Sequence, residues 1–181
     1  MIHAIVQFIT AHAHWAGPLV GLVALTEAIA VAGSFVPGST ILVAVGAAAG
    51  AARLSVWPLV AWAVVGAVAG DTLSYGLGLR HGSRLLAMRP FAYRPQWTER
   101  ARALLARRGD LAVFAGRLLP PLRALMPLLA GMARLPLLRF LLADLLAAVV
   151  WAVVHLASGA VIGHWLFHGG NWHDLWHTIA R

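Results

Sequence analysis

Two arginines stand in a stretch that is otherwise apolar enough to enter a membrane. Residues 111–133 read LAVFAGRLLPPLRALMPLLAGMA and include Arg117 and Arg123. A guanidinium at the centre of a bilayer costs roughly 2.5–3.5 kcal/mol even on the mildest insertion scale, which disfavours a simple lipid-facing span. Two guanidiniums held in a half-wet cavity are suited to bind a phosphate or a carboxylate.

The prolines between these arginines predict how the stretch folds. Pro120 and Pro121 remove two backbone donors and cannot continue a straight helix. Interrupted backbone is tolerated at membrane depth only where protein buries it or a watery cavity receives it. On one unbroken helix the two arginines would lie about 240° apart, whereas a turn near Pro120–Pro121 lets both face one cavity. We therefore expect a re-entrant hairpin over residues 111–133. The alternative is that the arginines only bond carbonyls freed by the prolines.

A second interrupted stretch comes earlier in the chain and carries an acid. Residues 15–52 are mostly apolar, contain Glu27, and are divided by Pro37-Gly38, a strong turn signal. The part after this turn would span about 21 Å as a helix, less than the bilayer core of about 30 Å. We expect a first re-entrant hairpin here. Glu27 is then a counter-ion to an arginine or a protonatable switch, since burial favours its neutral form and an arginine its charged form.

Two stretches are long enough to cross a bilayer, namely residues 56–80 and 137–166. Asp71 in the first is expected to fix a hairpin or to pack against an arginine, with a role in the site as the alternative. Asp144 and His155 in the second are 11 residues apart, which places them about 20° apart around a helix. They predict polar contacts between helices, or alternatively a proton relay.

Composition and charge place the whole chain in a membrane. The 181 residues are 61% hydrophobic and only 11% charged, and the absence of cysteine excludes disulfides. Residues 80–108 hold eight arginines against one acid, Glu99, which is typical of a cytoplasmic loop facing anionic lipid headgroups. Nucleic acid is disfavoured as a partner because this loop lacks interleaved stacking aromatics. The flanking segments, residues 1–14 and 167–181, are expected at the membrane interface.

The order of elements is hairpin, span, basic loop, hairpin, span. With the basic loop in the cytoplasm, the two halves run in opposite directions and their hairpins enter from opposite faces. The predicted fold is therefore an all-α integral membrane protein, an inverted repeat of a re-entrant helical hairpin plus a transmembrane helix. In such repeats the binding site lies where broken helices meet near the midplane. Sequence similarity between the halves is weak, so this expectation rests on the order of elements.

Metal, cofactor and hydrolase chemistry have little support. Four histidines near the C-terminus include two i,i+4 spacings that suit metal ligation, but Gly169-Gly170 interrupts the helix and no cysteine or paired acid helps. The four are His164, His168, His173 and His177. No serine has a histidine and an acid at the spacing of a nucleophile's partners. We expect no metal, no cofactor and no enzymatic step.

Several segments, in order along the chain, resemble the DedA family, also called the VTT or SNARE-associated membrane protein family. The segment GRLLPPLRALMPLLAG is the most specific, being similar to the family's signature of arginines around prolines. The segments are Glu27 with Pro37-Gly38 and GAAAG after it, GDTLSYGLGLRHG at 70–82, GRLLPPLRALMPLLAG at 116–131, and Trp151 with 159–163.

The resemblance implies two facing re-entrant hairpins in the bacterial inner membrane, and lipid transport. Bacterial members recycle undecaprenyl phosphate, and eukaryotic relatives scramble phospholipids. The family's essential acid and arginines would fall on Glu27, Arg117 and Arg123. Many members have a second acid directly after the Pro-Gly turn, where this chain has Ser39. That departure speaks against a proton mechanism that uses two carboxylates.

We therefore expect a flippase or scramblase for a polyprenyl phosphate or a phospholipid. Arg117, Arg123, Glu27 and Ser39 are the expected substrate-binding residues. The supporting residues are Asp71, Pro37, Gly38, Pro120, Pro121, Asp144 and His155. The alternatives are a proton-coupled carrier of a small soluble anion or drug, and a non-transporting membrane-assembly protein. Gly- and Ala-rich faces would allow a homodimer.

Overall fold

The protein is described by a computed structural model that covers residues 13–29, 38–86, 96, 99, 103, 105–123 and 125–168. Its elements are all helices, and no strand occurs in these ranges, which confirms the expected all-helical class. The helices are α2 (Ala13–Ala28), α3 (Gly38–Ala51), α4 (Trp57–Leu86), α6 (Gly109–Leu118), α7 (Pro120–Arg123), α8 (Leu125–Met132) and α9 (Leu137–His168).

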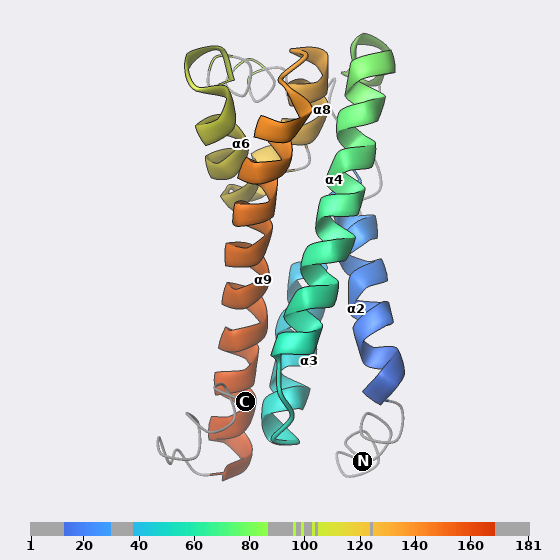
Figure 1. The fold of residues 1–181 in the computed structure, drawn as a ribbon. Coiled ribbons are helices and arrows are strands. Elements are labelled where there is room, and N and C mark those ends of the chain that lie inside the picture. The colour runs from blue at the N-terminus through green and yellow to red at the C-terminus, as the bar shows by residue number, and fades with distance from the viewer. Residues whose placement is uncertain are drawn as a thin grey trace.

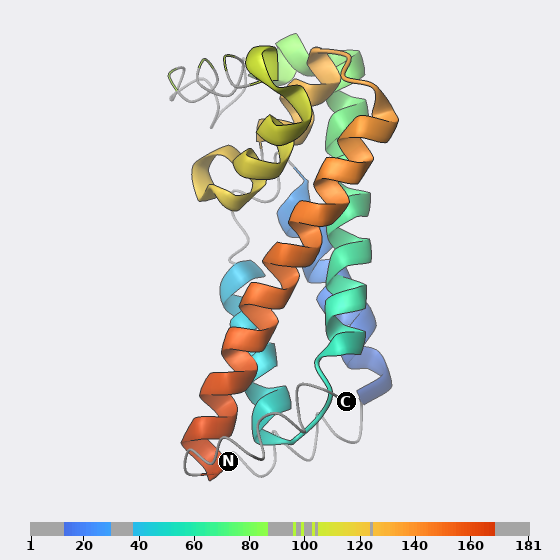
Figure 2. The same cartoon turned by 60° about the vertical axis from the view of Figure 1, so that its left-hand side comes forward.

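Two long helices run the length of the molecule, and the short helices form two groups, one in each half (Figure 1). Helices α4 and α9 contact each other and diverge toward their lower ends (Figure 2). The pair α2 and α3 fills the lower half, and α6, α7 and α8 fill the upper half. By length and composition, two segments could cross a membrane, Trp57–His81 and Leu137–Phe167, while Trp15–Ala28 and Gly38–Ala51 are apolar but shorter.

Each group of short helices packs on both long helices. Helix α2 lies along α4 and α3 lies along α9, whereas α6 lies along α9 and α8 lies along α4. The first short helix of each group, α2 or α6, therefore contacts the long helix that follows its own group in the chain. The last short helix, α3 or α8, contacts the other long helix. This exchange binds the two groups of short helices and the two long helices into one bundle.

A local repeat joins each group of short helices to its long helix. The segments GAARL at 50–54 and GMARL at 131–135 lie 81 residues apart and end α3 and α8 in the same way. Arg53 and Arg134 adopt left-handed backbone, with φ of 55° and 53°. The leucine after each donates its N–H to an alanine carbonyl five residues back, at 2.9 and 3.0 Å. This is the Schellman end of a helix, made twice without glycine at the left-handed position.

Glycines bring the crossing helices into backbone contact. A Cβ on Gly46 or Gly50 of α3 would overlap the backbone of α9, and a Cβ on Gly159 or Gly163 of α9 would overlap that of α3. In the other half Gly78 of α4 meets a carbonyl of α8 in the same manner. Small residues four apart are the usual means of close helix packing in membranes. The glycine-rich segments therefore serve contacts within this chain.

Two helix ends lie close to the boundaries expected from the sequence. The turn expected near Pro120–Pro121 falls one residue earlier, at Leu119, whose backbone is extended (φ −96°, ψ 112°). Pro120 then opens α7, because a proline's missing N–H costs nothing in the first turn of a helix. Helix α4 also continues past the expected end at residue 80 to Leu86, with non-helical backbone at His81. The segment 1–12, Pro37, most of the 87–104 region and the tail from 169 lie outside the described residues.

Two glycines on α4 should respond oppositely to the same substitution. Gly78→Ala would drive a methyl group into the carbonyl oxygen of Leu128, whereas a Cβ added to Gly76 would meet no atom within 4 Å. We expect Gly78→Ala to lower the free energy of unfolding by about 1–3 kcal/mol through overpacking. Gly76→Ala should raise it by up to about 1 kcal/mol, because alanine is the better helix former. Thermal unfolding in detergent micelles measures both, and equal shifts would contradict the packing described here.

Candidate functional site

The ends of the short helices meet at mid-height, and five charged side chains gather there (Figures 1 and 2). Glu27 is the last residue but one of α2, and Arg117 is the last but one of α6. Ser39 is the second residue of α3, and Arg123 is the last of α7. The breaks in the two halves therefore bring side chains far apart in sequence to one level.

The first cluster, here called the glutamate cluster, consists of Arg123, Glu27 and Ser39. Arg123 Nη1 lies 2.9 Å from Glu27 Oε1 and donates to Ser39 Oγ at 3.1 Å. The backbone N–H and the hydroxyl of Ser39 both donate to Glu27 Oε1, at 3.1 and 2.9 Å. The side chains of Arg123 and Glu27 are 11% and 10% exposed. The carboxylate thus sits at the N-terminus of α3, where the helix dipole favours negative charge.

The second cluster, here called the aspartate triad, consists of Arg117, Asp71 and Asp144. Arg117 Nη1 contacts Asp71 Oδ2 and lies 2.7 Å from Asp144 Oδ1. All three side chains are buried, with 1–2% of their surface exposed. One guanidinium from α6 therefore joins the two long helices, because Asp71 belongs to α4 and Asp144 to α9.

Trp151 of α9 lies close to both arginines. Its ring centroid is 4.3 Å from Cζ of Arg123 and 6.0 Å from Cζ of Arg117, and both guanidiniums lie over the ring. Distances up to about 6 Å allow a cation–π interaction. The indole is 4% exposed and also belongs to the apolar core of the lower half. The two clusters are thus neighbours around one aromatic side chain.

Several donors of the site have no hydrogen-bond partner within the described part of the chain. They are Nε and Nη2 of Arg117, Nη2 of Arg123 and Nε1 of Trp151, and all are buried. Leaving a buried donor unsatisfied costs about 1–3 kcal/mol, and more where the donor is charged. An anion with several oxygens could use these donors only in place of a carboxylate, because Glu27, Asp71 and Asp144 also have buried oxygens without a hydrogen bond there.

Close packing explains why a glycine precedes Ser39. A Cβ on Gly38 would overlap the carboxylate of Glu27, so only glycine lets α3 begin this near to α2. At the other break, the carbonyl of Leu119 accepts the backbone N–H groups of Leu122 and Arg123, at 2.9 and 3.0 Å. These bonds start α7 directly and turn Arg123 back toward the end of α6.

The structure brings together most of the residues singled out from the sequence. Arg117 and Asp71 share one cluster with Asp144, and Arg123 shares the other with Glu27 and Ser39. His155 is not part of either: its Nδ1 lies 2.7 Å from the carbonyl oxygen of Trp151, one turn back on its own helix. The side chains of Pro120 and Pro121 and all of Pro37 lie outside the described residues.

Trp151 is the site residue whose role sequence reasoning missed. The sequence marks it only as part of the family resemblance, because a buried tryptophan in an apolar helix needs no special explanation. A signal is present, however: Asp144 and Trp151 are seven residues apart, which places them about 20° apart around α9. An acid and an aromatic ring on one inward face could both receive arginines from another helix.

The histidine set weighed for metal binding falls mostly beyond what the structure describes. His173 and His177 are outside the described residues, as is the side chain of His168. His164 is buried in α9, on the half that packs against α3. Across the described residues, no three histidine or acidic side chains are grouped so that they could hold a metal ion.

Comparison with known proteins finds one family and several membrane proteins. The family model described as the VTT domain matches residues 36–161. Inner membrane protein YabI of Escherichia coli is 27% identical over 157 residues, which cover 87% of this chain and 62% of that protein. The membrane protein Rv2637 of Mycobacterium tuberculosis is 35% identical over 141 residues, 72% of this chain and 64% of that protein.

A membrane protein of Buchnera aphidicola (subsp. Schizaphis graminum) is 28% identical over 145 residues, which cover 80% of this chain and 58% of that protein. The chain thus spans about three fifths of the length of the relatives that it matches. No solved structure matches it significantly. The relatives' names place them in membranes, and this chain is a membrane protein of the same kind.

The aspartate triad should make Arg117 far more important for stability than an exposed arginine. Arg117→Leu would leave two carboxylates buried without a cation, so we expect the free energy of unfolding to fall by about 3–5 kcal/mol. Adding Asp71→Leu and Asp144→Leu should recover most of this loss, because replacing a whole buried ion cluster by apolar residues is often neutral. Thermal unfolding in detergent measures the series, with the exposed Arg139→Leu as the control. An unchanged midpoint for Arg117→Leu would contradict the triad.

Proposed function

We propose that this chain, which belongs to the VTT-domain family, also called the DedA family, is a transporter of phosphate-headed lipids. It would act as a flippase or scramblase in the bacterial inner membrane. The substrate would be a polyprenyl phosphate such as undecaprenyl phosphate, or a phospholipid. The placement of the helices, the unpaired donors of the site and the hydrophilic residues visible at mid-height support this proposal.

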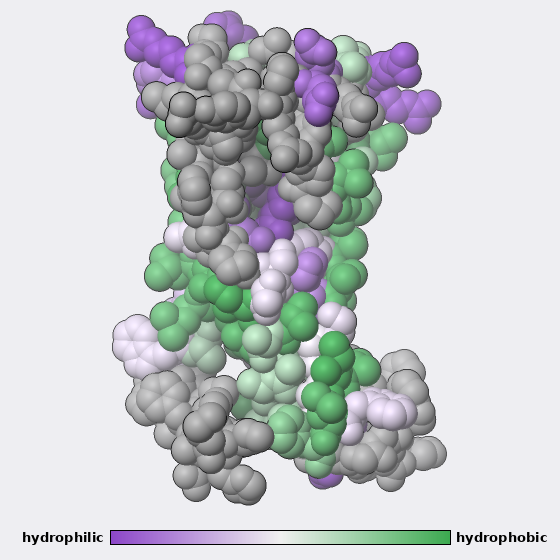
Figure 3. Space-filling view, turned by 180° about the vertical axis from the view of Figure 1, so that it is seen from behind, coloured by the Kyte–Doolittle hydropathy of each residue, from purple (hydrophilic) through white to green (hydrophobic). Residues whose placement is uncertain are grey.

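The proposed placement in the bilayer follows from helix length and charge. The mainly apolar segments of α4 and α9 are 25 and 31 residues long, enough to cross a core that needs about 20. Helices α2 and α3 have 16 and 14 residues, about 24 and 21 Å. Together they would form a hairpin that enters the membrane and turns back at mid-depth. Hydrophilic residues gather where α4 ends and α9 begins (Figure 3). This end would face the cytoplasm and its anionic headgroups.

The main support for the proposal is that two buried guanidiniums have N–H donors without a hydrogen-bond partner among the described residues. Arg117 and Arg123 are held at the level where both hairpins end, and each still has a buried N–H group without a partner among the described residues. Charges inside a membrane are expensive and mark substrate pathways by default. A phosphate group offers several oxygens at once and matches the fork of a guanidinium.

The position of the site favours a lipid over a soluble solute. At mid-height the molecule exposes hydrophilic residues on its side, between hydrophobic ones (Figure 3). Large apolar side chains of α9 are exposed around this level, such as Val154 at 57% and Leu146 at 62%. A headgroup can enter such a site sideways while its tails stay in the lipid, whereas a soluble anion would need a watery path along the bundle.

Exchange of ion pairs supplies a transport step without covalent chemistry. Glu27 neutralises Arg123 between substrates, and an arriving phosphate takes its place on the guanidinium. Glu27 keeps two donors from Ser39 when this happens, so its charge is not left without a partner. Release on the other side restores the original pair. Because no bond of the lipid is made or broken, we propose a transporter and not an enzyme.

Lipid translocation in proteoliposomes tests this proposal. Arg117→Ala and Arg123→Ala, singly and together, should reduce the rate for a fluorescent phosphatidylglycerol and for a polyprenyl phosphate by at least about tenfold. Loss of one charge-assisted hydrogen bond is worth about 1.5–3 kcal/mol, and about 1.4 kcal/mol is a factor of ten. The control is Arg139→Ala, an exposed arginine on α9 that should keep the rate of the unaltered protein.

The same samples separate the rival functions. Lipid translocation at the unaltered rate by the double variant would refute the assignment. Uptake of radiolabelled inorganic phosphate without lipid movement would instead indicate a carrier of soluble anions. Arginine variants with lower thermal stability but no specific loss of translocation would indicate that the arginines have a structural role in a protein that does not transport lipid.

A further inference from the structure

The indole of Trp151 contacts Arg123 in a way that does not compete with an anion. Cζ of Arg123 lies over the ring, 4.3 Å from its centroid, so the guanidinium contacts the face of the indole. The indole face has no acceptor oxygen, and Nη2 of Arg123 has no hydrogen-bond partner among the described residues. Glu27 and Ser39, in contrast, occupy Nη1 directly.

This difference matters because the proposed exchange removes one of the two contacts that hold Arg123. When a phosphate displaces Glu27, the ion pair that fixes the guanidinium is lost. A free arginine side chain samples many rotamers, so a guanidinium without a second contact would bind the anion more weakly. The contact with Trp151 would persist through the exchange, since the indole face offers no oxygen and so does not compete with the phosphate for hydrogen bonds.

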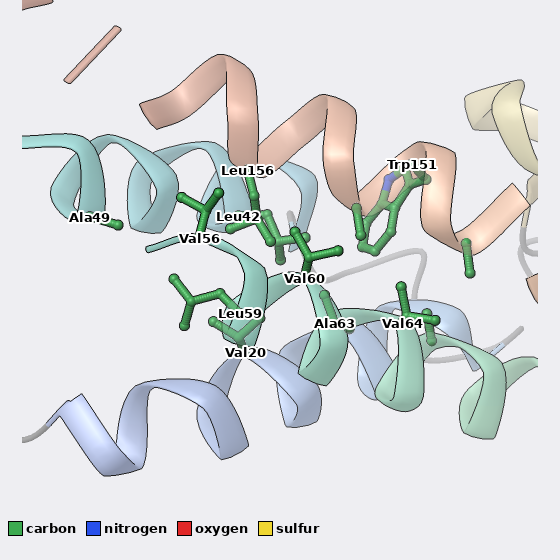
Figure 4. Packing of buried hydrophobic residues seen from close by; sticks show 14 of the residues in the cluster. Val20, Leu42, Ala49, Val56, Leu59, Val60, Ala63, Val64, Trp151 and Leu156 are labelled. Atoms are coloured by element: carbon green, nitrogen blue, oxygen red, sulfur yellow. The ribbon is translucent and has the colours of Figure 1, made fainter. Parts of the chain in front are cut away.

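Trp151 is itself held rigidly, which lets it serve as a fixed platform. Its ring is 4% exposed and packs in the apolar core with Val60 and Val64 of α4 (Figure 4). On its own helix it lies between Ala148 and Ala152, both fully buried. A binding residue is most effective when a packed neighbour fixes its geometry in advance.

We propose that Trp151 is the positioning residue of the anion site: its indole face holds the guanidinium of Arg123 in place while the substrate's phosphate takes over from Glu27. This inference rests on the proposed function and adds to it a residue that determines affinity. The ring also lies 6.0 Å from Cζ of Arg117, so the same side chain is a neighbour of both cations.

The test compares two replacements that differ in their aromatic face. Trp151→Phe keeps a face and loses the indole N–H, and Trp151→Met fills space without a face. The rate of translocation is measured in proteoliposomes over a range of mole fractions of fluorescent phosphatidylglycerol. We expect Trp151→Met to raise KM about tenfold, as a desolvated cation–π contact is worth enough for that change, with a smaller effect on the maximal rate. Trp151→Phe should stay within about threefold of the unaltered protein.

A matched control and a second measurement protect the test from misfolding. Trp62→Met removes another tryptophan of the bundle, one that packs on Gly17 and Gly21 of α2, and it should leave KM unchanged. If Trp151→Met does not fold, site-specific fluorination of Trp151 replaces it. Added fluorine weakens the negative face of the ring while keeping its shape and its N–H, so KM should rise stepwise with each fluorine.

The outcomes separate this inference from the proposed function. An unchanged KM for Trp151→Met or for the fluorinated protein, with arginine variants that do lose transport, would overturn the role of Trp151 alone. So would a Trp151→Phe variant as impaired as Trp151→Met, because the N–H and not the face would then matter. Transport that survives loss of both arginines would overturn the proposed function instead.

Discussion

The ion pairs at mid-height are the constraint on which the rest of the structure depends. Two guanidiniums and three carboxylates lie in an otherwise apolar bundle, and burying such charges is costly unless each has a partner. The partners are on different helices, so the pairing decides how the elements meet. Arg117 can reach Asp71 and Asp144 only if α6 ends between α4 and α9. Arg123 can reach Glu27 only if the two sets of short helices end at the same level.

The backbone geometry follows from the same need. A continuous helix would carry its charges around a cylinder, whereas a helix that ends at mid-height directs them inward. The two breaks achieve this with different residues, Gly38 where α3 must begin close to Glu27 and the extended Leu119 where α6 must stop. Glycines then let the helices approach until backbones touch, because a membrane offers helices little hydrophobic driving force to associate. A narrow, rigid polar site inside an apolar bundle results.

Much of this could be predicted from the sequence because the signals are local. Prolines beside arginines in an apolar run indicate interrupted helices, and the length of an apolar stretch decides whether it can span. The position of the second break was less predictable, since Pro120 opens a helix as readily as it ends one. The repeat GAARL and GMARL is also hard to detect, because five residues carry little signal until both are found to end helices through left-handed arginines.

The sequence by itself determined the class of protein, the interrupted helices and the charged residues that such helices would bring inside. These properties depend on composition and on neighbours in the chain. Only the tertiary structure decided the pairing: Arg117 with two aspartates, Arg123 with Glu27 and Ser39, and Trp151 against the guanidinium of Arg123. The reason is physical. Each of these pairs joins residues 27 to 96 positions apart, and which charges meet depends on where helices from both halves end in space.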